Sequence, residues 1–339
     1  MTALPNRPGK LGWPWRAPTH QGHRPAPGED LPRISIVTPS YNQGAFIEET
    51  IRSVLLQDYP QLEYLVMDGG STDGTVALLR EYDPWISTWV SEPDAGQVDA
   101  INKGLRQASG DLVMYLNSDD ILMPGALLSF ARAYRETGAL WLSGDAIYMA
   151  ADGTPVCDLI PLDNWDNNEL VRHLILNPRL VAVQVSNMFA RGYYDRFGLY
   201  NPQYDLCFDV EFGLRGLLAG VRPHVLHRHL ASARQHPNAK TTLQAVEHGF
   251  QRETCAILQS LDLGGNGALE AARAEALAEF SRLTSWRAIE ARLVGGDRWE
   301  LGKRAIGELA RSPSLILSRP FWGLVRRGLM FEGLGSRSS

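Results

Sequence analysis

The chain is poor in cysteine and has no long apolar run, and each shortage excludes a class of protein. Its three cysteines (Cys157, Cys207 and Cys255) are odd in number, lie far apart and form no CxxC pair. This usage indicates neither a zinc knuckle nor a disulfide framework, and a reducing compartment fits it best. No stretch of about eighteen uninterrupted apolar residues occurs, so we expect no integral membrane span.

The chain also lacks a marked excess of either charge. It has 33 basic and 38 acidic residues, a formal net charge of −5, so no global field favours nucleic acid and we expect no such partner. A hydrophobic content of 44% in 339 residues is typical of a globular protein with a sizeable core. The length predicts one large domain, or one domain with an appendage.

The first thirty residues lack the apolar run that a signal peptide or a membrane anchor requires. They contain instead six prolines, which disfavour regular structure. We therefore predict that residues 1–32 form a proline-rich arm that is mobile or draped over the surface.

Between residues 33 and 116, segments with strand and helix patterns alternate. The predicted strands are 33–38, 62–67, 86–90 and 111–116, and the predicted helices are 44–57, 73–82 and 96–108. In the first of these helices the apolar residues recur at helical spacing. Such alternation favours an α/β fold in which a mostly parallel sheet is flanked by helices.

Beyond residue 140 the alternation becomes irregular. The pattern predicts a hairpin-like pair at 141–150 and 154–160, a helix at 164–176, a strand at 180–190 and a helix at 207–219. After residue 245 the chain is rich in helix signals. We therefore predict an arm (1–32), an α/β domain (33–245) and a helical C-terminal extension (246–339).

An acidic cluster, Asn117-Ser118-Asp119-Asp120, directly follows the predicted strand 111–116. Two earlier strands end in TPSYN (38–42) and in DGGSTDGT (68–75), which contains neither GxGxxG nor GK[ST]. Ligands of open α/β sheets bind at the carboxyl ends of the strands, where carboxylates can hold a divalent cation on a diphosphate. A solvated turn or a helix N-cap is the simpler interpretation of any one strand end. Three of them together favour a ligand site.

Four motifs carry a resemblance to a known family: TPSYN, SVLLQDYPQLEYLVMDGGSTDGT, SEPDAGQVDAINKG and GDLVMYLNSDD. Over residues 33–240 the chain resembles inverting family 2 glycosyltransferases with the GT-A fold. The resemblance implies a nucleoside diphosphate sugar as donor, and a DxD motif that holds Mn²⁺ or Mg²⁺ on the diphosphate. It also implies an inverting reaction, in which a carboxylate takes the acceptor's proton as that oxygen attacks C1 of the sugar.

The resemblance assigns donor-binding roles to the first motifs. Pro39, Tyr41 and Asp68 would line the nucleoside pocket, and Asp99 and Lys103 would lie near ribose or phosphate. Taken alone, a lysine on a helix is usually a solvated residue, so the role assigned to Lys103 depends on the resemblance.

The DxD equivalent is Asn117-Ser118-Asp119, in which asparagine stands in place of the first acid. The resemblance makes Asp119 the principal metal ligand and gives the amide of Asn117 a contact with ribose. This departure leaves one carboxylate where the family has two.

A second acidic motif, Phe208-Asp209-Val210-Glu211, resembles the helix start that lies across the sugar in this family. Asp209 takes the position of the catalytic base, although Phe208 stands where an acid often precedes it. Glu211, two residues further on, belongs to a different helix face and is assigned to substrate binding. The alternative is a helix start enriched in acids by the macrodipole.

A histidine-rich stretch (221–242) follows this motif. His224, His227 and His229 match no zinc spacing and are compatible with strand alternation. Its final part, ARQHPNAKTT, resembles the RxH-containing loop of some family members. The resemblance brings Arg234 and His236 to the diphosphate.

The C-terminal segment 320–331 mixes aromatic residues and leucines with arginines, as an interfacial membrane segment does. A helix docked on the protein's own core is an equally good interpretation. The first interpretation implies a cytoplasmic protein in peripheral contact with the inner face of the cytoplasmic membrane.

The sequence thus predicts a metal-dependent glycosyltransferase of hexosyltransferase type, with a glycan or lipid-linked acceptor in bacterial cell-surface polysaccharide or glycolipid synthesis. A nucleotidyltransferase is disfavoured because no glycine-rich basic loop lies near the first strand. A catalytically inactive scaffold that binds nucleotide sugars stays open, because Asn117 and Phe208 both depart from the acidic pattern.

Overall fold

The computed structural model describes residues 4–16, 25–158, 166–176, 184–240 and 244–293. The chain divides into two compact units, residues 1–273 and 274–339. The sheet and every predicted site residue belong to the first unit.

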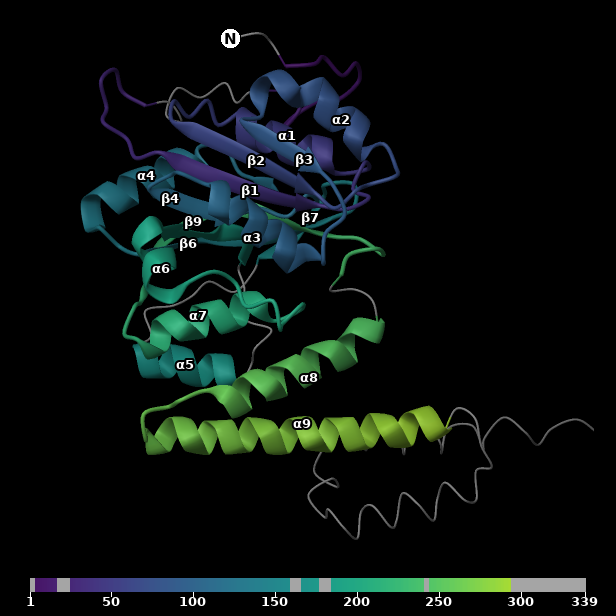
Figure 1. Ribbon diagram of the computed structural model, residues 1–339, viewed down its shortest axis with the longest axis vertical. Helices are drawn as coiled ribbons and strands as arrows, with labels where there is room; N and C mark the ends of the chain where they lie inside the picture. Colours follow the sequence, from purple (N-terminus) through teal and green to yellow (C-terminus); the bar gives the residue numbers. More distant parts are fainter. Residues whose placement is uncertain (1–3, 17–24, 159–165, 177–183, 241–243, 294–339) are drawn as a thin grey trace, which may run out of the picture. The chain divides into compact units, whose positions relative to one another are not determined.

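The first half of the sheet is parallel, in the order β3-β2-β1-β4 (Figure 1). Its strands are β1 (Ile34–Ser40), β2 (Leu62–Asp68), β3 (Thr88–Ser91) and β4 (Leu112–Tyr115). The helices between them are α1 (Ile47–Leu55), α2 (Thr75–Tyr82) and α3 (Gln97–Gln107), with a 3₁₀ turn η2 (Asp83–Trp85) before β3. The predicted alternation is confirmed, with boundaries that differ by a few residues.

The second half of the sheet mixes directions and continues in the order β8-β6-β9-β5. Its strands are β5 (Ile121–Leu122), β6 (Trp141–Ala150), β7 (Pro155–Asp158), β8 (Asn187–Ala190) and β9 (Pro223–Gln235). The predicted hairpin is the antiparallel pair β6 and β7. Strand β9 pairs in parallel with β6 and in antiparallel with β5, which directly follows the acidic cluster. This pairing brings the end of β9 to the acidic cluster.

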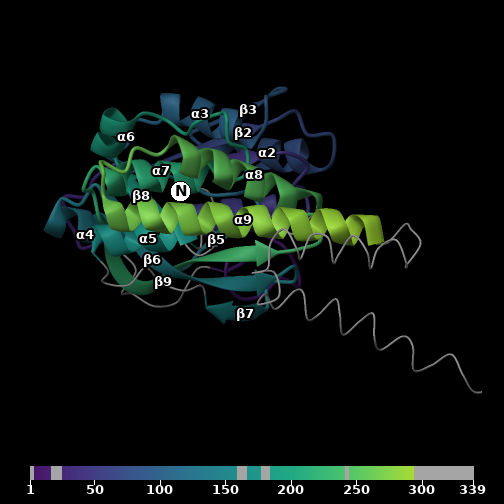
Figure 2. The same cartoon turned by 90° about the horizontal axis from the view of Figure 1, so that it is seen from below.

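The remaining helices come after β5 in the chain, between the later strands and beyond β9. They are α4 (Ala126–Thr137), α5 (Asn167–Leu176), η3 (Gln184–Ser186), α6 (Arg191–Phe197), α7 (Phe208–Leu218), α8 (Gln244–Ser260) and α9 (Gly267–Leu293). Helix α8 is bonded to the segment just before α7 (Figures 1 and 2). The first unit extends beyond residue 245 because α8 is bonded to the segment before α7.

Among the helices described, none is both long and apolar enough to cross a bilayer. Segment 320–331 lies outside the described residues.

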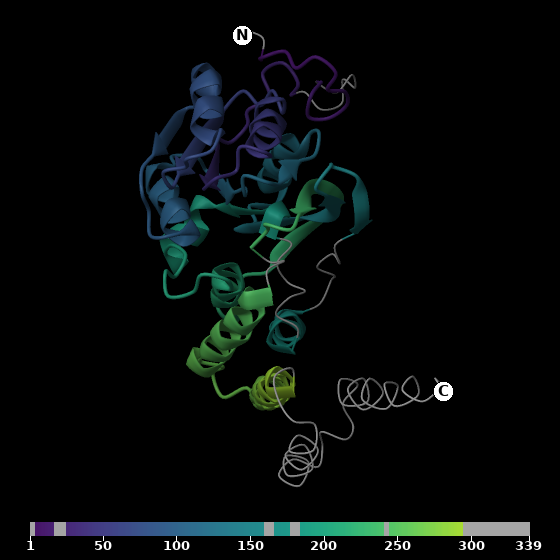
Figure 3. The same cartoon turned by 90° about the vertical axis from the view of Figure 1, so that its right-hand side faces the viewer.

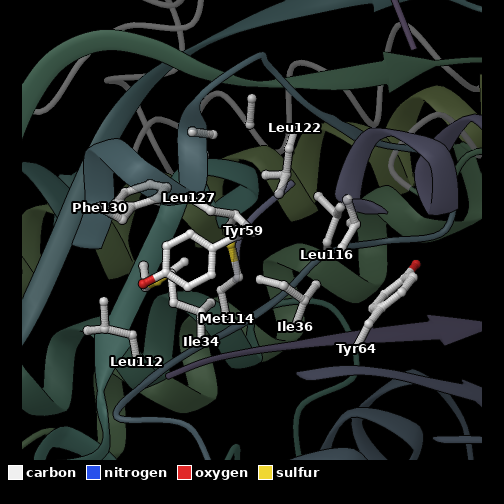
Figure 4. Packing of buried hydrophobic residues seen from close by; sticks show 14 of the residues in the cluster. Ile34, Ile36, Tyr59, Tyr64, Leu112, Met114, Leu116, Leu122, Leu127 and Phe130 are labelled. Atoms are coloured by element: carbon white, nitrogen blue, oxygen red, sulfur yellow. The ribbon is translucent and has the colours of Figure 1, made fainter. Parts of the chain in front are cut away.

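Strand β1 lies inside the parallel half of the sheet, and its sequence ISIVTPS mixes apolar residues with small polar ones. All seven residues of β1 are buried, as expected for a central parallel strand covered on both faces. Ile34 and Ile36 pack with Leu112 and Met114 of β4 and with Phe130 of α4 (Figure 4). Burying each such side chain contributes about 1.5–3 kcal/mol relative to exposure.

Helix α3 lies unusually close to the sheet because one of its residues has no side chain. A Cβ atom on Gly104 would lie 2.4 Å from Cγ1 of Val37 and 3.3 Å from Cγ of Met67. Only glycine therefore permits this packing of α3 on β1 and β2. The close approach sets the height of α3 above the strand ends.

Residues 4–16 of the N-terminal arm are anchored on α1 (Figure 3). The Arg52 guanidinium, on a side chain only 5% exposed, donates to the carbonyl oxygens of Pro14 (3.2 Å), Pro5 (2.9 Å) and Trp15 (2.8 Å). Trp13 donates from its indole nitrogen to the Leu122 carbonyl at 2.7 Å. This part of the arm is thus draped over the domain and fixed there.

Candidate active site

The carboxyl ends of the parallel strands are aligned. Ser40 of β1 is in register with Asp68 of β2, and Asp68 is in register with Ser91 of β3. The Asp68 carboxylate is 2% exposed and accepts hydrogen bonds from the Ser71 backbone (2.9 Å), the Ser71 hydroxyl (2.5 Å) and the Ser91 hydroxyl (2.6 Å). Asp68 therefore orders the turn after β2, and its oxygens keep acceptor capacity on the edge where a nucleoside would lie.

Pro39 and Tyr41 differ in exposure although they are neighbours. Pro39 is buried and lies beyond the last residue pair between β1 and β4, so its missing N–H leaves no ladder bond unmade. Tyr41 follows the strand and is 62% exposed. An exposed aromatic ring at this edge offers a surface on which a base can stack.

A cavity of about 290 Å³ opens between the ends of β2 and β3 and the side of α3. Its lining includes Asp68, Glu92, Asp94, Lys103 and Arg106. This volume is at the lower end of the range for small-molecule sites, roughly 300–1,000 Å³. Asp68 and Lys103, two of the predicted donor-binding residues, thus share one concave site.

Lys103 is held by two carboxylates in this structure. Its ammonium lies 3.2 Å from Glu92 Oε1 and 3.3 Å from Asp99 Oδ2. The Asp99 carboxylate also accepts the backbone N–H of Ala95 at 3.1 Å, and this bond, helped by Lys103, lowers the pKa of Asp99. An approaching phosphate would have to compete with these two carboxylates for Lys103.

Asn117 is the hub of an amide network behind the acidic loop (residues 117–120). Its Oδ1 accepts from Gln97 Nε2 (2.8 Å), and its Nδ2 donates to Asp120 Oδ2 (3.1 Å) and to Gln184 Oε1 (3.2 Å). Both ends of the side chain therefore have protein partners. A contact with ribose, as the resemblance implies, would use remaining capacity of the amide.

The two carboxylates of the acidic loop face different surroundings. Asp120 is buried and accepts the backbone N–H of Arg234 at 2.8 Å, so it ties the loop to β9. Burial raises the pKa of Asp120 well above its usual range, and the adjacent Asp119 carboxylate acts in the same direction. Asp119 points instead to His236, whose Nε2 lies 3.0 Å from its Oδ2.

The buried side chain of Arg234 is hydrogen-bonded to the acidic loop. Its side chain is 1% exposed and donates to the Asp119 carbonyl (2.9 Å), the Ala151 carbonyl (2.8 Å) and Glu49 Oε2 of α1 (2.5 Å). The guanidinium also lies 5.1 Å from the centre of the Phe46 ring. Buried in this way, Arg234 has protein partners in every direction, so its predicted contact with the diphosphate would need a rearrangement.

Asp209 lies in the first turn of α7 and is partly buried. With Gln184, Tyr115 and several aromatic side chains it lines a cavity of about 20 Å³, which has room for about one water molecule. Burial raises the pKa of Asp209 to about 6, although backbone N–H bonds at the helix start and the Lys240 ammonium oppose this. A carboxylate with such a pKa is suited to accept a proton near neutral pH.

Glu211 faces away from Asp209, as its place two residues further along the helix predicts. Its Oε2 accepts from Arg215 at 2.9 Å, and Arg215 also donates to the carbonyl oxygens of Phe197 (2.5 Å) and Leu199 (2.9 Å). Burial raises the pKa of Glu211, and Arg215 opposes the shift. Glu211 thus has a bonded structural partner, and its predicted contact with substrate stays a prediction.

Three residues of this site were not predicted from the sequence. Lys240 donates to Asp205 Oδ1 (2.7 Å) and to Gln97 Oε1 (3.3 Å), and Gln97 and Gln184 both bond Asn117. Lys240 lies in the same segment as Arg234 and His236, so its charge was a usable signal. The two glutamines carry no such signal, because only the fold brings them to the loop.

Asp119 and His236 are the pair that could hold a divalent cation. A carboxylate oxygen and an imidazole nitrogen 3.0 Å apart offer the mixed oxygen and nitrogen set that Mn²⁺ accepts. Within the described residues, no third His, Cys, Asp or Glu joins them into a larger cluster, so the diphosphate would have to supply further ligands. The pair therefore fits a cation that binds together with its substrate.

Comparisons of sequence identify relatives of this chain. Residues 35–197 match the family described as Glycosyl transferase family 2. An uncharacterized glycosyltransferase of Mycobacterium tuberculosis is 32% identical over 192 residues, which cover 55% of this chain and 70% of that protein. TuaG of Bacillus subtilis, named for teichuronic acid biosynthesis, is 37% identical over 128 residues, which cover 37% of this chain and 51% of TuaG.

Comparisons of structure identify folds like this one. TarS 1–349 of S. aureus in complex with UDP-GlcNAc has a TM-score of 0.53 at 19% identity, covering 74% of this chain and 72% of TarS 1–349. The mannosyltransferase PcManGT of Pyrobaculum calidifontis in complex with GDP-Man and Mn²⁺ has a TM-score of 0.51 at 19% identity. The match covers 87% of this chain and 84% of PcManGT. The sheet, the strand-end site and these similarities agree: the chain belongs to glycosyl transferase family 2 and has the GT-A fold.

Proposed function

We propose that this protein is an inverting glycosyltransferase that transfers a sugar from a nucleoside diphosphate sugar to an acceptor hydroxyl. One observation carries the proposal: Asp209 shares a cavity with Gln184, whose amide also contacts Asn117 of the acidic loop. The Asp209 carboxylate, whose pKa is raised, thus lies beside the loop at which the family binds its donor. Inversion needs one such base and no covalent intermediate.

In this proposal, one group of site residues binds the donor, and Asp209 acts on the acceptor. Tyr41 and Asp68 receive the nucleoside, and the cavity at Lys103 lies next to them. Asp119 and His236 would hold Mn²⁺ or Mg²⁺, which supplies charge for the departing diphosphate when bound. Asp209 takes the proton of the acceptor hydroxyl as the oxygen forms its bond to C1 and the bond from C1 to the diphosphate breaks. Arg234 keeps the acidic loop in position throughout.

The names of relatives support a role in bacterial surface glycans. TuaG is named for teichuronic acid biosynthesis, and a partial match in Campylobacter jejuni, 33% identical over 110 residues (31% of this chain and 36% of that protein), is named a glucosyltransferase that acts on an undecaprenol-linked glycan. We therefore propose a glycan or lipid-linked acceptor. The sugar transfer would take place at the inner face of the cytoplasmic membrane, where nucleotide sugars are available.

The test is a panel of UDP- and GDP-sugars incubated with the full-length protein, with Mn²⁺ or with EDTA. Release of free nucleoside diphosphate from one donor, dependent on metal and lost in Asp209→Asn, would support the proposal. NMR of the transferred sugar then reports the anomeric configuration, which must be opposite to that of the donor. Tight binding of a nucleotide sugar without any turnover, with lipid-linked and glycan acceptors present, would favour the inactive scaffold instead.

A further inference from the structure

The helix that carries Asp209 begins after a segment held by one distant carboxylate. Glu253 of α8 accepts hydrogen bonds from three consecutive backbone N–H groups, those of Asp205 (3.0 Å), Leu206 (2.8 Å) and Cys207 (3.0 Å). Bonds to an ionised acceptor are about twice as strong as neutral ones. Glu253 is 9% exposed, so these bonds are largely shielded from water.

Helix α7 has no side-chain cap of its own, and Glu253 holds the N–H groups of the N-cap residue and of the two residues before it. The N-cap residue, Cys207, makes no side-chain hydrogen bond to the first turn. Its thiol instead contacts α8, with Sγ 3.7 Å from the Phe250 carbonyl oxygen and 3.6 Å from Thr254 Oγ1. Helix α8 therefore fixes the point at which α7 begins. Asp209 follows two residues later.

Glu253 also contributes charge to the surroundings of Asp209. Its hydrogen bonds in the described part of the chain come from backbone N–H groups, which leave its negative charge in place. Burial is the main cause of the raised pKa of Asp209, the Glu253 carboxylate adds to it, and the Lys240 ammonium opposes it. The phenols of Tyr115 and Tyr200 also face Asp209.

We infer that Glu253 is a positioning residue, which holds the start of α7 and with it the carboxylate of Asp209. The inference rests on the proposed role of Asp209 as base. It extends the catalytic machinery to α8, a helix outside the part of the chain that matches the family. Phe208 leaves no acid directly before Asp209, and Glu253 supplies a carboxylate near this point from another helix.

The test compares two variants of the full-length protein. Glu253→Gln removes the charge and one of the two acceptor oxygens, whereas Glu253→Asp keeps the charge but has a shorter reach. Glu270→Gln is the matched control, since Glu270 is a helical glutamate paired with Arg273. The readouts are thermal unfolding, donor affinity, the pH dependence of kcat, and titration of the Asp209 carboxyl carbon by ¹³C NMR without substrate.

Both Glu253 variants should lose kcat by about 10–10²-fold, as expected when a catalytic group is displaced, with donor affinity unchanged. In Glu253→Gln the Asp209 carboxyl should also titrate at lower pH than in the wild type, and in Glu253→Asp near the wild-type pH. Wild-type kcat in both folded variants, or an unchanged Asp209 titration in Glu253→Gln, would overturn the inference. If the wild type turns over no nucleotide sugar, the proposed function fails, while the NMR titration still decides whether Glu253 acts on Asp209.

Discussion

At the scale of single residues, the role proposed for Asp209 as a base is in conflict with stability. Burial raises the pKa of Asp209 to about 6 from an ordinary value of 3.8. Between these two values the native state holds a proton that the unfolded chain releases, so stability falls as the pH rises through this window. Above pH 6 the folded protein keeps a poorly solvated carboxylate in place. Such a cost is expected at a group that must accept a proton.

Asp209→Asn should therefore lower transfer and stabilise the protein at the same time. Turnover should fall by about 10²–10⁴-fold, because the amide cannot accept the proton, and donor affinity should be retained. The free energy of unfolding at pH 8 should rise by about 1–3 kcal/mol relative to wild type, and the difference should vanish below pH 4. Urea unfolding at a series of pH values, alongside donor titrations, measures both effects.

Glu211→Gln is the control for this prediction. It leaves Asp209 untouched and weakens only the bond to Arg215, so its effect on turnover should be mild. Loss of transfer in Glu211→Gln together with retained transfer in Asp209→Asn would mean that the base is assigned to the wrong residue of the motif.

A second prediction at this scale concerns the pair Asp119 and His236. Asp119→Ala and His236→Ala should each weaken the binding of UDP or GDP in the presence of Mn²⁺ by about tenfold or more, and have little effect in EDTA. Each variant removes one of the two groups that could hold the cation. Calorimetric titration with and without Mn²⁺ measures this.

His229→Ala provides the comparison, because His229 lies on β9, the strand that ends just before His236, but pairs with Asp158. It should bind nucleotide with wild-type metal dependence. If the affinity of Asp119→Ala still rises with Mn²⁺ as it does in the wild type, Asp119 is not the metal ligand.

At the scale of elements, the site depends on how closely helices approach the strand ends. Helix α3 carries Asp99 and Lys103 and can lie where it does only because position 104 is glycine. Helix α1 contacts the acidic loop directly: the Thr50 hydroxyl donates to the Asp120 carbonyl at 2.7 Å, and Glu49 holds Arg234. A change in either helix should therefore be transmitted to the candidate donor site.

Gly104→Ala should push α3 away from the sheet. The added methyl group would overlap Val37 in a closely packed region, which should cost about 1–3 kcal/mol of stability and also weaken nucleotide binding. Gly267→Ala, at a glycine with open space around it, should change stability by less than about 0.5 kcal/mol. Thermal unfolding and nucleotide titration test both; equal stability of the two variants would contradict the packing argument.

Arg52→Lys should release the N-terminal arm. A lysine ammonium cannot reach the carbonyl oxygens of Pro5, Pro14 and Trp15 together, so stability should fall by about 1–3 kcal/mol. Trypsin should then cut faster after Lys10. Arg132→Lys, which alters an exposed pair with Glu29, should cost less than about 1 kcal/mol. Unchanged cleavage in Arg52→Lys would mean that other contacts hold the arm.

At the scale of the whole molecule, the fold was easier to predict from the sequence than the site. The parallel half could be located because its strand segments, rich in β-branched and other apolar residues, alternate with helix patterns. Strand ends that carry Asp68 and Asp119 could be located for the same reason. Local patterns could not reveal the pairing of Asp119 with His236, or the bonds from Glu253 to the start of α7, because these contacts join residues far apart in the chain.

The hold of β9 on the acidic loop has a consequence for how the protein matures during synthesis. Asp119 and Asp120 are synthesised before the residues that they contact. Asp120 accepts the backbone N–H of Arg234, and the Asp119 carboxylate lies against the His236 ring. A nascent chain that ends at residue 197, where the family match ends, would hold β1 to β4, which pair in parallel with one another, and yet lack Asp209, Arg234 and His236. The growing polypeptide can thus bring Asp119 and His236 together only after strands β1 to β4 have been made.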